Sequence, residues 1–200
     1  MLPEIRTKFD DNIARVRNLV TLYTDALAGV GQGRRPVNSS DVLRAATVLL
    51  HATLEEFLRG ISRWRLPDAS EDALNEIPLV GLQRADKFQL GRLSRHRGES
   101  IDDVITASIE KHLERSNYNN TTEITHLLES IGVDVQRVND LYPQLTELIE
   151  RRHLIVHRAD RDNHPGRGFH RTKSIGRQNI LRWIDIVVEF AARVCNELAE

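Results

Sequence analysis

Apolar residues recur every three or four positions along most of this chain, and this period constrains the fold more than any other feature. Glycine and proline, which interrupt helices, number only 11 and 6 in 200 residues, and they are clustered. The period and its interruptions predict helices over residues 4–28, 40–64, 68–76, 100–115, 121–131, 140–158 and 174–198. The chain is therefore predicted to be all-α.

The order of these helices predicts a bundle. The first two are long and are joined by a short linker, Gly29–Pro36, so they are expected to pack antiparallel. Ser39 or Ser40 is a candidate cap for the second helix, Ser100 for the fourth, and Asp140 for the sixth. The sixth and last helices form a second pair late in the chain. A chain of this length is expected to form one domain over residues 1–200.

Composition excludes several classes of protein. Hydrophobic residues make up 40% and charged residues 28%, which is typical of a globular chain rather than a disordered one. No apolar run approaches the roughly 18 residues that a membrane span needs. Met1–Asp10 carries charges of both signs without an apolar segment, and Cys195 is the single cysteine. We therefore expect a protein of a reducing compartment, the cytoplasm, with no multi-cysteine metal site.

The charge of the chain is uneven. Its formal net charge is −1, but residues 1–150 carry −5 and residues 151–200 carry +4. Residues 151–177 contain eight basic and two acidic residues, together with four of the eight histidines. A positive patch with titratable imidazoles is what a site for phosphodiesters needs, although a solvated basic loop has the same composition.

The helix that leads into this basic segment places an arginine on its apolar stripe. The stripe runs through Leu141, Leu145, Leu148 and Ile149, and the next position at helical spacing is Arg152. A guanidinium on such a stripe is costly unless it is paired or lines a cleft. Arg152 is therefore expected either to meet a carboxylate of the second helix, such as Glu55 or Glu56, or to face an anion at an interface.

His153 and His157 follow Arg152 in the same predicted helix, and the helical geometry decides which of the three residues share a face. On an ideal helix, five positions separate Arg152 from His157 by about 140°, whereas four positions separate His153 from His157 by only about 40°. The two histidines therefore share a face, and Arg152 does not. For Arg152 and His157 to act together, the arginine must swing round, the last helical turn must distort, or a partner subunit must supply the missing group.

These residues resemble a known family. Arg152 and His153, followed by three residues and His157, are similar to the R-x4-H motif of HEPN domains, with its polar residue after the arginine. The order of a late motif helix, a loop and a closing helix is similar as well. The segment Ala52–Leu58 resembles the acidic and apolar stretch of the RiboL-PSP-like HEPN branch. The expected architecture is thus a HEPN-like helical bundle.

The resemblance implies a metal-independent endoribonuclease that acts on single-stranded RNA as a homodimer and needs no cofactor. By position, His157 is the acid/base residue, Arg152 contacts the phosphate and the transition state, and His153 tunes the site. The RNA contacts are expected from Arg151, Arg158 and Arg161, with support from Glu55 and Glu56. Such proteins are often toxins or antiviral effectors restrained by an antitoxin or another regulatory protein. Some HEPN domains are inactive and only bind RNA or protein, which is the alternative.

The chemistry of RNA cleavage asks for the same residue types. Without a metal, the 2′-hydroxyl must lose a proton, the leaving oxygen must gain one, and charge on the phosphorus must be stabilised. Histidine can perform both proton transfers, and arginine stays charged and grips phosphate with two donors. This route discriminates against DNA, which lacks the 2′-hydroxyl.

A metal site is a further alternative for the same residues. His153 and His157 have the spacing of zinc ligands on a helix, and a third ligand could come from Asp160, His164 or His170. The glutamate of an H-E-x-x-H motif is absent, because Leu154 follows His153. Neither a G-x-S-x-G elbow nor a P-loop motif is present.

Overall fold

The computed structural model describes residues 1–27, 37–80, 90–161 and 172–199. Across these residues the chain is helical, and its one extended pairing is an isolated bridge between Arg161 and Thr172. The all-α prediction is confirmed. The predicted linker Gly29–Pro36 and the loop histidines His164 and His170 lie outside the described residues.

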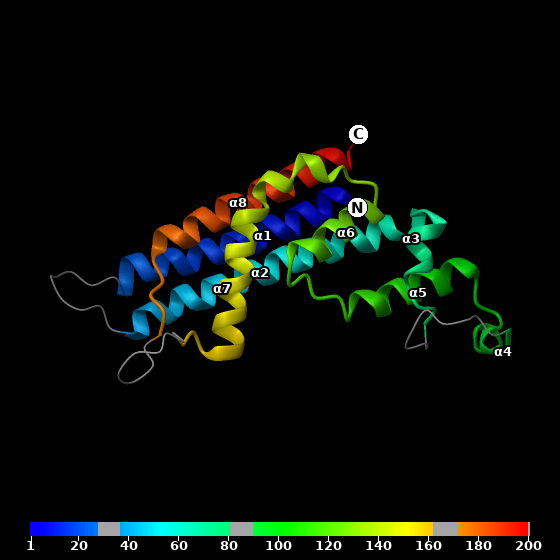
Figure 1. Ribbon diagram of the computed structural model, residues 1–200, viewed down its shortest axis with the longest axis horizontal. Helices are drawn as coiled ribbons and strands as arrows, with labels where there is room; N and C mark the ends of the chain where they lie inside the picture. The colour runs from blue at the N-terminus through cyan, green and yellow to red at the C-terminus, as the bar shows by residue number, and fades with distance from the viewer. Residues whose placement is uncertain (28–36, 81–89, 162–171, 200) are drawn as a thin grey trace.

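Two long antiparallel helices, α1 and α2, form the centre of the molecule (Figure 1). Helix α1 spans Leu2–Leu22 and continues as a π-helical turn, η1, over Tyr23–Leu27, while α2 spans Val37–Arg65. The predicted apolar stripes face one another, and the rings of Phe9 and Phe57 pack at a centroid distance of 5.2 Å. Helix α2 also contacts α5, α7 and α8. It is therefore the helix around which the others assemble.

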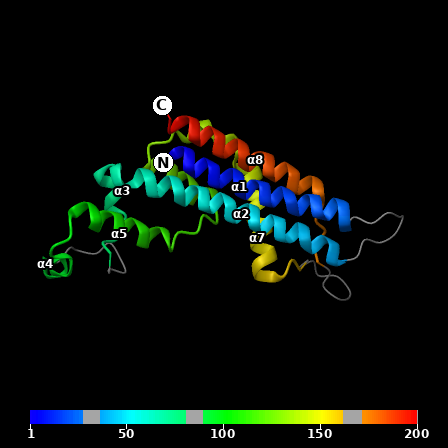
Figure 2. The same ribbon diagram turned by 180° about the vertical axis from the view of Figure 1, so that it is seen from behind.

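The closing helix, α8, covers the central pair, and α7 crosses the pair at a steep angle (Figures 1 and 2). Helix α7 spans Tyr142–Arg158 and α8 spans Arg177–Glu197. The apolar side of α8 is buried through Ile180, Trp183, Ile184, Val187, Phe190, Ala191, Val194 and Cys195. The two chain ends lie near each other, at the end of the bundle away from the start of α8.

The remaining elements are shorter. They are η2 (Leu66–Asp68), α3 (Glu71–Asn75), α4 (Leu90–Leu93), η3 (Ser94–His96), α5 (Ile101–Leu113), α6 (Thr121–Ser130), η4 (Val135–Arg137) and η5 (Asn139–Leu141). Ser100 caps α5 as predicted, in a capping box with Asp103. Asn120 caps α6, since its side chain accepts a hydrogen bond from the Glu123 amide.

Three predicted helix starts are wrong by a few residues. Helix α2 begins at Val37, before Ser39 and Ser40. Asp140 does not cap α7, because a 3₁₀ turn carries the chain to Leu141 and the Asp140 carboxylate instead pairs with Arg193 of α8 at 2.8 Å. Helix α8 begins at Arg177, because the preceding carbonyls accept bonds from a buried arginine described below.

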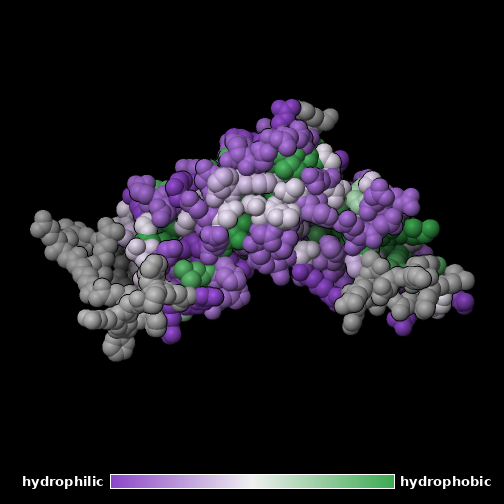
Figure 3. Space-filling view, in the orientation of Figure 1, coloured by the Kyte–Doolittle hydropathy of each residue, from purple (hydrophilic) through white to green (hydrophobic). Residues whose placement is uncertain are grey.

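The described surface is mainly hydrophilic on the face that displays α7, and it is indented between α7 and the loop before α6 (Figure 3). Of the helices that the structure describes, none combines the length and apolarity that crossing a membrane requires. The fold thus presents the basic end of α7 beside a polar recess.

Candidate functional site

The candidate site lies on the second half of α7, which stays a regular helix to Arg158. Two residues with left-handed backbone, Ala159 (φ 49°) and Asp160 (φ 58°), then end it. The Asp160 amide donates to the Leu154 carbonyl at 3.1 Å, which satisfies part of the open helix end. The last turn of α7 therefore does not distort, and one of the three ways to bring Arg152 and His157 together is excluded.

The buried arginine of this segment is Arg151, not Arg152. Arg151 is 7% exposed, and its Nη2 lies 2.7 Å from Asp160 Oδ2. The same Nη2 donates to the carbonyls of Lys173 and Ser174 at 2.9 and 3.2 Å. Arg44 Nε of α2 donates to the same carboxylate oxygen at 2.6 Å. We call Arg44, Arg151 and Asp160 the arginine clamp.

The arginine clamp joins α2 and the end of α7 to the chain that enters α8. Burial lowers the pKa of the Arg151 guanidinium, the Asp160 carboxylate opposes that effect, and Arg44 adds to it. The Lys173 amide donates to the Asp160 carbonyl at 2.8 Å. This bond joins the end of α7 to the segment that precedes α8. A phosphate contact by Arg151, as expected from sequence, would require this guanidinium to leave Asp160.

Arg152 is half-buried and faces the loop before α6. Its Nη1 donates to Asn119 Oδ1 at 3.4 Å. Burial raises the pKa of Glu55, and the charges of Arg59 and Arg152 oppose that effect, so Arg152 acts electrostatically on this carboxylate of α2. Glu55 therefore lies where a supporting residue was expected. Among the residues that the structure describes, the direct hydrogen bond of Arg152 is to a neutral amide.

Glu56 is placed differently from Glu55. One position further along α2 turns its side chain by about 100°. Glu56 is exposed and lines a separate small cavity between α1 and α2, with Glu4, Lys8 and Arg63. Of the two expected supporting carboxylates, the structure brings only Glu55 to the side of α7.

His153 and His157 form a pair on the outer side of α7. Their ring centroids are 4.5 Å apart with an interplanar angle of 43°, and both residues are exposed. The predicted shared face of these two histidines is confirmed. Val156, beside them, is also 48% exposed, which is unusual for an apolar side chain at the end of a packed helix. The outer side of α7 therefore offers two imidazoles and an uncovered apolar residue.

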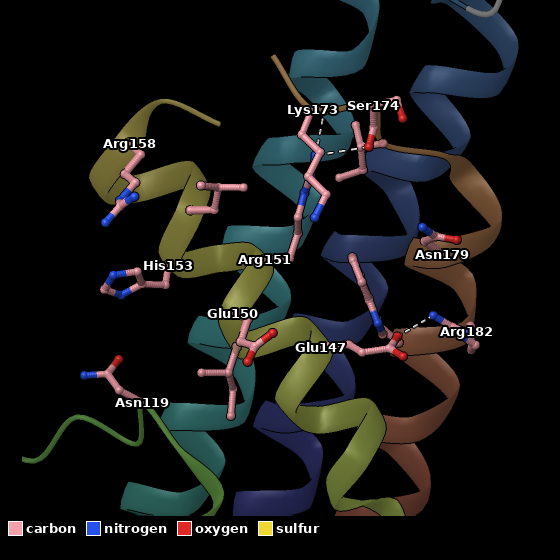
Figure 4. A pocket seen from close by; sticks show the side chains of 14 residues that line it. Asn119, Glu147, Glu150, Arg151, His153, Arg158, Lys173, Ser174, Asn179 and Arg182 are labelled. Carbon is pink, nitrogen blue, oxygen red and sulfur yellow. Dashed lines mark hydrogen bonds and ion pairs between the residues drawn. The ribbon is translucent and has the colours of Figure 1, made fainter. Parts of the chain in front are cut away.

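A cavity of about 590 Å³ runs along α7 toward α8. His153 and Arg158 lie on one side of it and Glu147 and Arg182, which form an ion pair, on the other (Figure 4). The rest of the lining is Asn119, Ile149, Glu150, Arg151, Leu154, Lys173, Ser174, Ile175, Asn179 and Trp183. Arg161 is exposed just past the end of α7. Arg158 and Lys173 thus add cations to a cavity whose lining includes His153.

The metal alternative has two of its five candidate ligands on the described outer face. Asp160 is held in the arginine clamp, so it does not join His153 and His157. His164 and His170 fall in the part of the chain that the structure does not describe. Within the described ranges, no group of three or more histidine, cysteine or acidic side chains could hold a metal ion.

Two contacts of the site were missed from sequence. The arginine clamp joins residues 116 positions apart, and nothing in the local period signals that Arg44 reaches Asp160. A signal existed in Asp160 itself, an acidic residue that directly follows the basic last turn of α7. Asn119 reaches Arg152 from a loop 33 positions away, and no sequence pattern indicates this contact.

An all-α bundle with an R-x4-H segment on its penultimate long helix is the arrangement that the resemblance to HEPN domains predicted. The family model described as RiboL-PSP-HEPN matches residues 10–200, so the chain belongs to that family. The match includes all of α2, α7 and α8. No curated protein and no solved structure matches the chain.

Proposed function

We propose that this protein is a metal-independent endoribonuclease that cleaves single-stranded RNA at a composite arginine and histidine site between two copies of the chain. The observation that carries the proposal is the exposed His153–His157 pair, next in sequence to Arg152 on a helix with regular geometry. Membership of the RiboL-PSP-HEPN family supports it.

The paired imidazoles suit proton transfer to and from RNA. His157 would take the proton of the 2′-hydroxyl or return one to the leaving oxygen, and His153 would orient it through their 4.5 Å ring contact. Arg152 would stabilise the charge that develops on the phosphorus. Arg158 and Arg161, both exposed near the pair, would hold the neighbouring phosphates.

A second copy of the chain is part of this proposal because one copy presents Arg152 and His157 in different directions. Arg152 points toward Asn119 and α2, while His157 lies on the outer face with His153. A two-fold axis near Val156 would cover this exposed apolar residue and place His157 of each copy near Arg152 of the other. Such a cleft would hold both an acid and a base.

The biological role that we propose is that of a cytoplasmic toxin or antiviral effector, whose cleavage a partner protein restrains. An enzyme that cuts single-stranded RNA without a cofactor would need restraint in its own cell. An exposed site at the end of α7 would be open to a covering protein.

The test is cleavage of end-labelled single-stranded RNA in excess EDTA by the wild type, His157→Ala and His96→Ala. His96 lies in η3, bonded to Glu99, far from α7, and serves as the matched histidine control. We expect the wild type and His96→Ala to leave 2′,3′-cyclic phosphate ends, and His157→Ala to lose about 100-fold to 10,000-fold in rate. A folded His157→Ala protein that still cleaves would refute the assignment, and a wild type that binds RNA without cleaving it would support a binding module.

Mixing two inactive variants tests the composite site. Arg152→Ala and His157→Ala are expected to be inactive alone. After mixing and exchange of subunits, a heterodimer keeps one arginine and one histidine that face each other across the axis, so activity returns. Random pairing makes about half of the dimers mixed, and each mixed dimer keeps one of its two Arg152–His157 pairs, so recovery should approach about a quarter of the wild-type pairs at most. A wild type that is strictly monomeric by light scattering contradicts the composite site.

A further inference from the structure

A second cavity, of about 560 Å³, opens beside the candidate site between α3, α5, α6 and the loop 114–120. This volume is within the range of about 300 to 1,000 Å³ that small-molecule sites occupy. The buried part of its lining is apolar and consists of Leu66, Leu113, Tyr118 and Leu127, with the half-buried Ile77. Such a lining suits a flat apolar group rather than an ion.

The polar groups of this cavity favour an uncharged ligand that both donates and accepts hydrogen bonds. Burial lowers the pKa of His112, Glu76 opposes that effect and His126 adds to it. This favours the neutral ring, which offers one donor and one acceptor. Glu76 pairs with His126 at 2.8 Å. Among the described residues of the lining there are two carboxylates, Glu76 and Glu123, and one arginine, Arg115. This excess of negative charge disfavours a phosphate inside the cavity.

Asn119 belongs to the lining of both cavities. Its side-chain oxygen accepts from Arg152, and its backbone amide donates to Glu123 Oε2 of α6 at 2.9 Å. The loop is therefore fixed between the arginine proposed to bind the scissile phosphate and the wall of the second cavity. A nucleotide next to that phosphate would reach this cavity past Asn119.

We propose that the second cavity is a subsite for one nucleobase of the RNA strand, an inference that rests on the proposed ribonuclease function. The apolar lining contacts the faces of the base, and His112, Asn117 and Asn119 bond to its edge. Single-stranded RNA is recognised in this way, by unstacked bases bound through their faces and edges. The phosphates stay outside, on the side of Arg152 and Arg158.

Binding of a short 2′-O-methyl oligonucleotide, which lacks the attacking hydroxyl, tests the subsite without cleavage. Fluorescence anisotropy would compare the intact strand with strands that carry one abasic position each. For the full-length protein, we expect one abasic position to weaken binding by about 5-fold to 150-fold, from the roughly 1–3 kcal/mol of a base contact. The other positions should have smaller effects.

Two variants locate this effect in the cavity. Thr122→Trp, at an exposed position of the lining, fills the cavity and should bind the intact strand as weakly as the wild type binds the abasic one. Asn117→Ala, also exposed, should give a smaller loss in the same direction, which guards against misfolding of the first variant. The control, Glu129→Trp, is exposed on the same helix outside this lining and should bind like the wild type.

The outcomes separate this inference from the ribonuclease proposal. If the wild type binds the strand and all abasic positions weaken it equally, or if the abasic penalty persists in Thr122→Trp, the base subsite is refuted while the RNA site stands. If the wild type binds no oligonucleotide, both proposals fail. A penalty that is abolished by Thr122→Trp and kept by Glu129→Trp establishes the subsite.

Discussion

The two sides of the last turns of α7 use the same residue types in opposite ways. On the inner side, Arg151 is buried and shares Asp160 with Arg44. On the outer side, His153, His157 and Arg158 are exposed. A charged side chain that is buried and paired therefore stabilises the fold, whereas one of the same type that is exposed is available to a ligand.

The largest expected effect is on the inner side. Asp160→Ala leaves the buried Arg151 without its anion and removes one of the two carboxylates that Arg44 contacts, the other being Asp41 at 2.9 Å, so we expect it to lower the free energy of unfolding by about 3–5 kcal/mol. Asp160→Asn should cost less, because its amide keeps an acceptor oxygen and tolerates the left-handed backbone. Urea denaturation measures both, with Asp185→Ala on the exposed side of α8 as the control. If Asp160→Ala is as stable as that control, the arginine clamp contributes nothing to the fold.

His51 is a buried histidine that the charge of Arg152 affects, and it predicts how the stability of the fold depends on pH. Burial lowers the pKa of His51 from 6.5 to about 4, and the charges of Arg152 and Arg59 add to the lowering. Between these values the unfolded chain binds a proton that the folded protein does not, so stability falls as the pH falls from 6.5 to 4. Taken alone, this contributes about 3 kcal/mol, partly offset by Glu55, whose raised pKa acts in the opposite direction.

Denaturation at pH 7, 5 and 4 checks this. His51→Leu should flatten the pH dependence of stability, whereas His153→Leu, on the exposed side, should keep it. Equal pH profiles for the wild type and His51→Leu would show that the buried imidazole is not linked to folding.

The sequence predicts what depends on the local period, and much of the molecule does. The stripes of α1, α2 and α8, and the shared face of His153 and His157, follow from spacing alone. The arginine on the stripe was predicted one residue too late, because a shift of one position turns a side chain by about 100° and the stripe is broad. The partners of Arg151 and Arg152 come from distant segments, Arg44 and Asn119, so no local pattern contains them.

Asn119 makes a smaller contribution that distinguishes Arg152 from Arg151. Arg152 donates to a neutral amide at 3.4 Å, so Asn119→Ala should reduce cleavage by about two- to tenfold, from the roughly 0.5–1.5 kcal/mol of one hydrogen bond, without loss of stability. Asn75→Ala, exposed on α3, is the control. Because Arg152→Ala is expected to be inactive, the cycle is read by binding of the 2′-O-methyl oligonucleotide: if Asn119 acts through Arg152, its substitution should not weaken binding further in an Arg152→Ala background. If Asn119→Ala causes the same loss in both backgrounds, Asn119 contacts the RNA directly and does not act through Arg152.

The smallest expected change in the free energy of unfolding concerns the exposed residues on the outer side of α7, and it tests most directly whether they are functional. His153→Ala, His157→Ala and Arg158→Ala each remove an exposed side chain, so each should change the free energy of unfolding by no more than about 0.5 kcal/mol. The His153–His157 ring contact lies on the surface, where both rings keep their hydration. Losing this contact should therefore not increase the loss of stability. Residues that cost the fold nothing and yet abolish cleavage are defined as functional by that difference. A loss of 2 kcal/mol or more in any of the three would instead place that residue with the arginine clamp, on the structural side of α7.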